Sequence, residues 1–119
     1  MENNYEIFNP EALMTNMMNQ IDIVKQMVQL YLSQGVIDFE NLKVAIENQD
    51  LPEIKAKAHH IKPTLSYIGA IDLLNDFQEL ESWAKENKPM DIINDKFQDI
   101  SISFQKLIEE LKDYYATLD

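Results

Sequence analysis

The chain has no cysteine, its ten basic residues are all lysine, and it contains only two glycines and four prolines among 119 residues. The lack of cysteine excludes disulfides and metal sites built from thiolates. The scarcity of glycine and proline leaves long stretches without residues that break regular structure, which favours helices. No apolar run approaches the roughly 20 residues that a membrane-spanning helix needs. The first residues have neither the basic nor the apolar stretch of a signal peptide, so we expect none.

Positive charge is also scarce, because 21 acidic residues outnumber the ten lysines and give a formal net charge of −11. Such a surface repels phosphate backbones and anionic lipids, so nucleic-acid and membrane partners are disfavoured. The hydrophobic fraction of 45% is ordinary for a globular protein, and the length suits one hydrophobic core. We therefore expect a single cytoplasmic domain over residues 1–119.

Apolar residues recur at helical spacing along most of the chain. Long helical segments are expected over about 20–48, from about 51 to 68, from 70 to about 86, and after the break at Pro89. The last segment shows the strongest pattern, with alternating steps of three and four, at Ile93, Phe97, Ile100, Phe104, Leu107, Leu111, Tyr114 and Leu118.

Residues that start and stop helices stand between these segments. Asn9 and Pro10 are typical of a helix start, and so is Asp50, where Glu53 is placed to complete a capping box. Gly69 is placed to end the third long segment. The connections are short, so neighbouring helices should pack antiparallel. The sequence thus predicts an all-α fold, an up-and-down antiparallel four-helix bundle with a short extra N-terminal helix.

The core faces of the first two helices follow from the same spacing. The short N-terminal helix should present Leu13, Met14, Met17 and Met18. The segment over 20–48 should bury Val24, Val28, Tyr31, Leu42, Ala45 and Ile46, with Leu32, Val36 and Phe39 widening that face. Gly35 lies inside this segment and is expected to weaken it slightly.

Two adjacent histidines lie in the third long segment. Its core stripe is formed by Ile54, Ala58, Ile61, Leu65 and Ile68. At about 100° per residue, His59 falls roughly 140° from the centre of this stripe and His60 roughly 120° away on the opposite flank. Neither histidine should therefore point into the core, which leaves either a functional imidazole or an ordinary solvated one.

Positive charge gathers around His59. Three of the ten lysines lie within residues 55–62, and Lys55, Lys62, Pro63 and Ser66 share the side of His59. A basic cluster on an acidic protein would attract a phosphoryl group and help to steer an acidic partner. Lysines also commonly solvate helix faces, so this pattern alone leaves both interpretations open.

Residues 58–62, with the glycine at 69, resemble the signature of histidine-containing phosphotransfer (HPt) domains. In that family the phosphorylated histidine is followed by an apolar residue two places on, a lysine three places on and a glycine ten places on. This register selects His59, with Ile61, Lys62 and Gly69 in the matching positions. The resemblance extends over roughly residues 30–85, and it includes Leu42, Ala45, Asp50, Leu73 and Glu81.

The resemblance implies a phosphocarrier in a multistep two-component phosphorelay. His59 would accept a phosphoryl group from a receiver-domain aspartate and pass it to another receiver. Lys62 would stabilise the charge of the phosphoryl oxygens, and Glu81 would orient the imidazole, as a glutamate at the matching position does in some family members. The domain would need no cofactor of its own, because the receiver supplies Mg²⁺, and it would not be an autonomous enzyme.

The expected partners are receiver domains of response regulators and a hybrid sensor histidine kinase, with the domain itself a monomer. Docking would use Lys55, Pro63, Ser66, Tyr67 and Gly69 beside the histidine. The family usually has glycine four places after the histidine, where this chain has Pro63. Proline has no N–H to donate to the carbonyl of His59, so a local kink or a loosened turn is expected.

Two other functions remain as alternatives. A degenerate, non-phosphorylated adaptor that binds a signalling partner would have the same composition. A metal site in the bundle is disfavoured, because the chain lacks the paired Glu-x-x-His motifs of di-iron bundles and adjacent histidines diverge by about 100° on a helix.

Overall fold

The computed structural model describes residues 5–118, and these residues are helical apart from short connections and the two ends. The first residues, on which the expectation of no signal peptide rests, lie partly outside this range. The elements are α1 (Pro10–Asn16), α2 (Ile21–Leu30), the π-helical turn η1 (Tyr31–Gly35), α3 (Val36–Glu47), α4 (Leu51–Tyr67), α5 (Ile71–Lys85) and α6 (Met90–Thr117).

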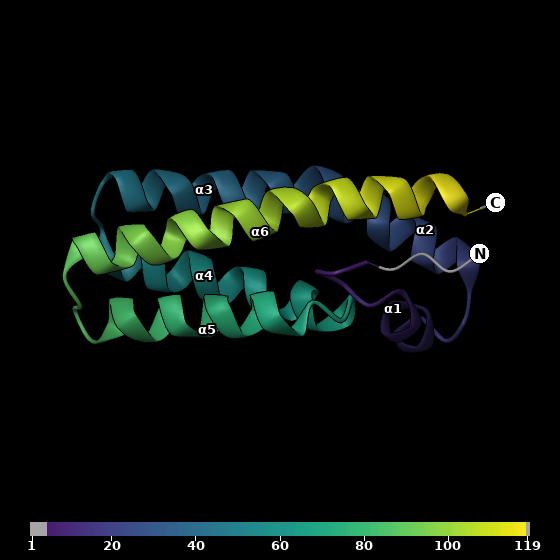
Figure 1. Ribbon diagram of the computed structural model, residues 1–119, viewed down its shortest axis with the longest axis horizontal. Helices are drawn as coiled ribbons and strands as arrows, with labels where there is room; N and C mark the ends of the chain where they lie inside the picture. Colours follow the sequence, from purple (N-terminus) through teal and green to yellow (C-terminus); the bar gives the residue numbers. More distant parts are fainter. Residues whose placement is uncertain (1–4, 119) are drawn as a thin grey trace.

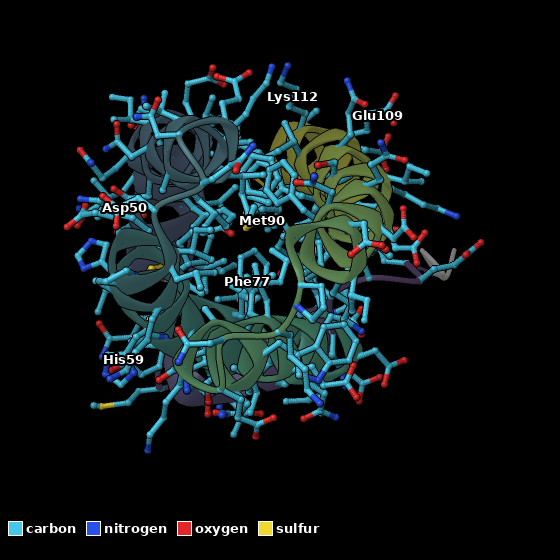
Figure 2. All side chains as sticks on the ribbon, turned by 90° about the vertical axis from the view of Figure 1, so that its left-hand side faces the viewer. Asp50, His59, Phe77, Met90, Glu109 and Lys112 are labelled. Carbon is cyan, nitrogen blue, oxygen red and sulfur yellow. The ribbon has the colours of Figure 1, made fainter. Side chains whose placement is uncertain are left out.

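These helices form an elongated bundle of 45 × 21 × 19 Å. The long helices run along its length, and α1 lies at one end (Figure 1). Helix α4 packs between α3 and α5, and α6 packs against α5 and α2. Seen along the long axis, the helices surround a core into which Phe77 points, whereas His59 lies on the outside (Figure 2). No helix within residues 5–118 is long and apolar enough to cross a membrane.

The predicted helix starts are confirmed. The Asn9 side chain accepts hydrogen bonds from the backbone N–H groups of Glu11 and Ala12, at the start of α1. The Asp50 side chain accepts one from the N–H of Glu53. The capping box is not completed, because the N–H of Asp50 donates to the carbonyl of Ala45 at 3.1 Å and not to the carboxylate of Glu53.

The segment predicted over 20–48 is helical, but it contains the π-helical turn η1 between α2 and α3. Gly35 is buried in this turn, and a Cβ there would be 2.8 Å from the ring of Tyr31. The glycine therefore makes room for a buried aromatic ring. The assignment of Val36 to the core was wrong, since its side chain is 41% exposed. Successive helical positions diverge by about 100°, so the residue after an inward-facing Gly35 faces outward.

The other predicted core positions are mostly confirmed. In α6 every predicted residue from Ile93 to Tyr114 is buried, and Leu118, just past the end of the helix, is partly buried. Phe39 lies against α6, where its ring stacks on that of Phe104 with centroids 4.0 Å apart. Met18 was predicted wrongly, because it follows the end of α1 with a φ of +58° and is 68% exposed.

The turn between α4 and α5 has the geometry of a glycine-terminated helix. Gly69 has a φ of +73°, and the N–H of Ala70 donates to the carbonyl of Leu65 at 2.9 Å, which is the 6→1 bond of a Schellman motif. Helix α1 covers this turn so closely that a Cβ at position 69 would lie 2.8 Å from Cβ of Asn9. Glycine is therefore required both by the backbone angle and by the packing.

We expect Gly69→Ala to lower the free energy of unfolding by about 2–4 kcal/mol. The alanine would be strained in the left-handed backbone conformation, and its Cβ would also overlap with Asn9 and α1. Urea unfolding would measure this change. Asn87→Gly is the matched control, since Asn87 also has a positive φ of 58°; we expect a change within about 0.5 kcal/mol there. Equal effects of the two substitutions would contradict this account of Gly69.

Candidate functional site

The turn at Gly69 brings two pairs of side chains together across α4 and α5. His59 and Glu81 lie eleven residues on either side of Ala70, and Lys62 and Gln78 lie eight residues on either side. Helices folded back on each other place such equidistant residues opposite one another. In the structure, Nδ1 of His59 lies 3.1 Å from Oε2 of Glu81, and Nζ of Lys62 donates to Oε1 of Gln78.

His59 is an accessible imidazole held at one nitrogen. Its side chain is 70% exposed, whereas that of Glu81 is only 15% exposed. The prediction that His59 faces away from the core is thus confirmed. The carboxylate is the less exposed partner of this contact. Glu81 can therefore hold the ring in place while the rest of the imidazole stays accessible to a reactant.

Glu81 is kept ionised by its neighbours. Burial acts to raise the pKa of this carboxyl, but Lys62 and His59 outweigh it and leave the pKa below its ordinary value. Nζ of Lys62 lies 2.6 Å from Oε1 of Glu81, while His59 contacts the other carboxylate oxygen. One carboxylate therefore bridges the histidine and the lysine.

The ionised carboxylate determines which nitrogen of a neutral His59 carries the proton. A carboxylate can only accept hydrogen bonds, so Nδ1 must be the protonated nitrogen that donates to Glu81. Nε2, on the other side of the ring, then has a free lone pair. An exposed, neutral imidazole with an oriented free nitrogen can act as a nucleophile.

His60 occupies a different environment. It faces α3, where Nε2 lies 3.6 Å from Oδ2 of Asp38, and its side chain is 68% exposed. That separation is too long for a hydrogen bond. The two histidines are thus equally accessible, but only His59 lies within hydrogen-bonding distance of its carboxylate.

Four of the five residues predicted for partner docking are exposed on α4, the helix that carries His59. Lys55, Pro63 and Ser66 are exposed on α4, and Tyr67 is 49% exposed. Helix α4 continues through Pro63 without a break, so proline is accommodated within the helix. Gly69 differs, because α1 packs against it and the fold itself accounts for the glycine.

Two residues near the histidines were not predicted from the sequence: Gln78, which binds Lys62, and Asp38, which faces His60. Gln78 is exposed and the Asp38 side chain is 20% exposed, but neither belongs to a local pattern that marks it, and their partners lie on other helices. The predicted roles of His59, Lys62 and Glu81 in chemistry stay predictions, although the structure brings the three side chains together. Within residues 5–118 no group of three or more His, Cys, Asp or Glu side chains is placed to hold a metal ion.

The family model described as Hpt domain matches residues 26–118. This match covers well over half of the chain and includes α4, α5 and the whole site. No curated protein and no solved structure matched the chain significantly.

We expect Lys62→Met to lower the free energy of unfolding by about 1–3 kcal/mol near pH 7, since the half-buried Glu81 loses its main counter-charge. With a lowered folded-state pKa, the wild-type Glu81 stabilises the fold near neutral pH, and this contribution is lost as the pH falls through that pKa. Protonation removes the uncompensated charge, so the deficit of the variant should shrink near pH 4.

Urea unfolding at both pH values would measure this difference. Lys57→Met is the matched control on the same helix, because Lys57 makes only an exposed contact of 3.9 Å with Glu53; it should change stability by less than about 0.5 kcal/mol. A deficit for Lys62→Met that does not change with pH would contradict the pairing with Glu81.

Pro63→Ala should raise the free energy of unfolding by about 1–3 kcal/mol, because it restores an N–H that can donate to the carbonyl of His59. Thermal and urea unfolding would show the gain. Ser66→Ala, also on the exposed face of α4, should gain only about 0.5 kcal/mol. An unchanged stability for Pro63→Ala would mean that this carbonyl already has another protein partner.

Proposed function

The chain belongs to the Hpt domain family, and we propose that it carries a phosphoryl group on Nε2 of His59 between two receiver domains. Family membership implies a phosphotransfer role in phosphorelays. The observation that carries the finer assignment is the contact of 3.1 Å between Nδ1 of His59 and the half-buried Glu81, which leaves Nε2 free on an imidazole that is 70% exposed.

In the proposed reaction the lone pair of Nε2 attacks the phosphorus of an aspartyl phosphate on a receiver. The bond from phosphorus to the aspartate oxygen breaks, and its electron pair leaves with the carboxylate. The ring gains positive charge, which the carboxylate of Glu81 stabilises while it holds the Nδ1 proton. The reverse steps deliver the phosphoryl group to a second aspartate.

Partner recognition would use the exposed face of α4. This face carries four exposed residues on the same helix as His59, namely Lys55, Pro63, Ser66 and Tyr67. A basic and partly apolar surface on a chain of net charge −11 fits the acidic pocket of a receiver. Receivers and a hybrid histidine kinase are thus the proposed partners, and the receiver would supply Mg²⁺.

We also propose that the long helices form an antiparallel four-helix bundle, with α2, η1 and α3 acting as one member beside α4, α5 and α6. The packing of α4 against α3 and α5, and of α6 against α5, supports this arrangement. Residues 1–119 would form one monomeric, cytoplasmic domain without a resident cofactor. The domain would act as an intermediate in transfer rather than as an autonomous enzyme.

The test is phosphotransfer from a phosphorylated receiver domain in the presence of Mg²⁺. We expect acid-labile, base-stable phosphate on the wild-type chain, none on His59→Gln, and most of it retained on His60→Gln. The adjacent histidine is a matched control, because the two side chains are 70% and 68% exposed.

Label retained by His59→Gln, or an equal loss in both variants, would reject His59 as the acceptor. A wild-type chain that takes no label from several competent receivers, but still binds them, would instead indicate a non-phosphorylated adaptor.

A further inference from the structure

Lys62 is turned toward α5 and held there by two side chains. Its ammonium lies 2.6 Å from Oε1 of Glu81 and donates to Oε1 of Gln78, and the lysine side chain is only 16% exposed. A lysine waiting freely for a phosphoryl group would extend into solvent. In this structure the ammonium of Lys62 instead contacts Glu81 and Gln78.

Gln78 is itself fixed in orientation. Its Nε2 donates to Oγ of Ser82 one turn later at 3.2 Å. The ammonium of Lys62 can only donate, so the oxygen of the Gln78 amide must face the lysine and its nitrogen must face Ser82. The amide is thus held as an acceptor for Lys62.

From these contacts we infer that Gln78 is a positioning residue of the phosphotransfer site, which retains Lys62 on α5 while His59 is unphosphorylated. This inference rests on the proposed function. Nε2 lies across the imidazole ring from the nitrogen that contacts Glu81, so phosphoryl oxygens on Nε2 lie on the far side of the ring. Lys62 must swing away from α5 to reach them, and the neutral amide of Gln78 is the weaker of its two partners.

A contact made in only one of two states shifts their equilibrium by its own free energy. The bond from Lys62 to Gln78 stabilises the unphosphorylated state, and it is lost when Lys62 binds the phosphoryl group. Gln78 therefore lowers the fraction of His59 that is phosphorylated at equilibrium. Such a carrier gives up its phosphoryl group more readily to the next acceptor.

The equilibrium can be measured without a protein partner by using phosphoramidate as the donor. Its P–N bond breaks, a new P–N bond forms at Nε2 of His59, and ammonia leaves with the proton it requires from water. At a fixed ratio of phosphoramidate to ammonium, the ratio of phosphorylated to free His59 reports the relative stability of the two states. Imidazole ¹⁵N NMR distinguishes His59 from His60.

We expect Gln78→Ala to raise this ratio about two- to fivefold, as the loss of one exposed hydrogen bond to a charged group implies. Gln78→Glu should lower the ratio by a similar factor, because a carboxylate holds Lys62 more firmly and repels the phosphoryl group. In a Lys62→Met background, Gln78→Ala should have no further effect. Gln105→Ala, at an exposed position on α6, is the matched control and should match the wild type.

An unchanged ratio for Gln78→Ala, shifts of the same sign for both Gln78 variants, or an effect that survives in Lys62→Met would overturn the inference while leaving His59 as the acceptor. A wild-type chain that takes no phosphoryl group at His59 would overturn both this inference and the proposed function. Melting curves for each variant separate these results from a loss of fold.

Discussion

The turn at Gly69 sets the geometry on which the site depends. Its left-handed backbone and the bond from Ala70 to Leu65 fix where α4 ends and where α5 begins. The N–H of Asn9 donates to the carbonyl of Ile68 at 3.1 Å, so α1 closes over the same turn. A shift of this turn by one residue would rotate α5 by about 100° and move Glu81 away from His59. A structural glycine ten residues away therefore positions the imidazole.

The electrostatics of the site follow from this hairpin. Glu81 is half-buried, and its charge is tolerated because Lys62 and His59 share it. The same sharing keeps Glu81 ionised, which in turn assigns the Nδ1 proton and frees Nε2 for chemistry. The burial of Glu81, its ion pair with Lys62 and the tautomer of His59 thus all follow from the packing of α4 against α5. Lys62 has two roles in this arrangement. It is the counter-ion of Glu81 while His59 is unphosphorylated, and it is also the candidate cation for the phosphoryl group.

Local signals made much of the fold predictable. Asn9 and Asp50 were recognised as helix caps, and Gly69 as a stop, because each acts on its own backbone within a few residues. Long-range contacts without a local pattern were not predictable. The carboxylate of Glu110 on α6 accepts bonds from the N–H groups of Glu6 and Ile7 at 2.9 and 3.0 Å, which fastens the segment before α1. Nothing near Glu110 in the sequence indicates this contact.

The site shows the same division between local and long-range information. Helical angles and family register selected His59 and Glu81 from the sequence, but neither could reveal how Lys62 is held, because Gln78 lies on another helix and resembles many solvated glutamines. Pro63 illustrates the converse. Its chemistry predicts a missing hydrogen bond to His59, yet α4 remains continuous. The helix can stay continuous because Pro63 lies on an exposed face, where water can bond the freed carbonyl. The same proline on the core stripe would leave that carbonyl without a partner.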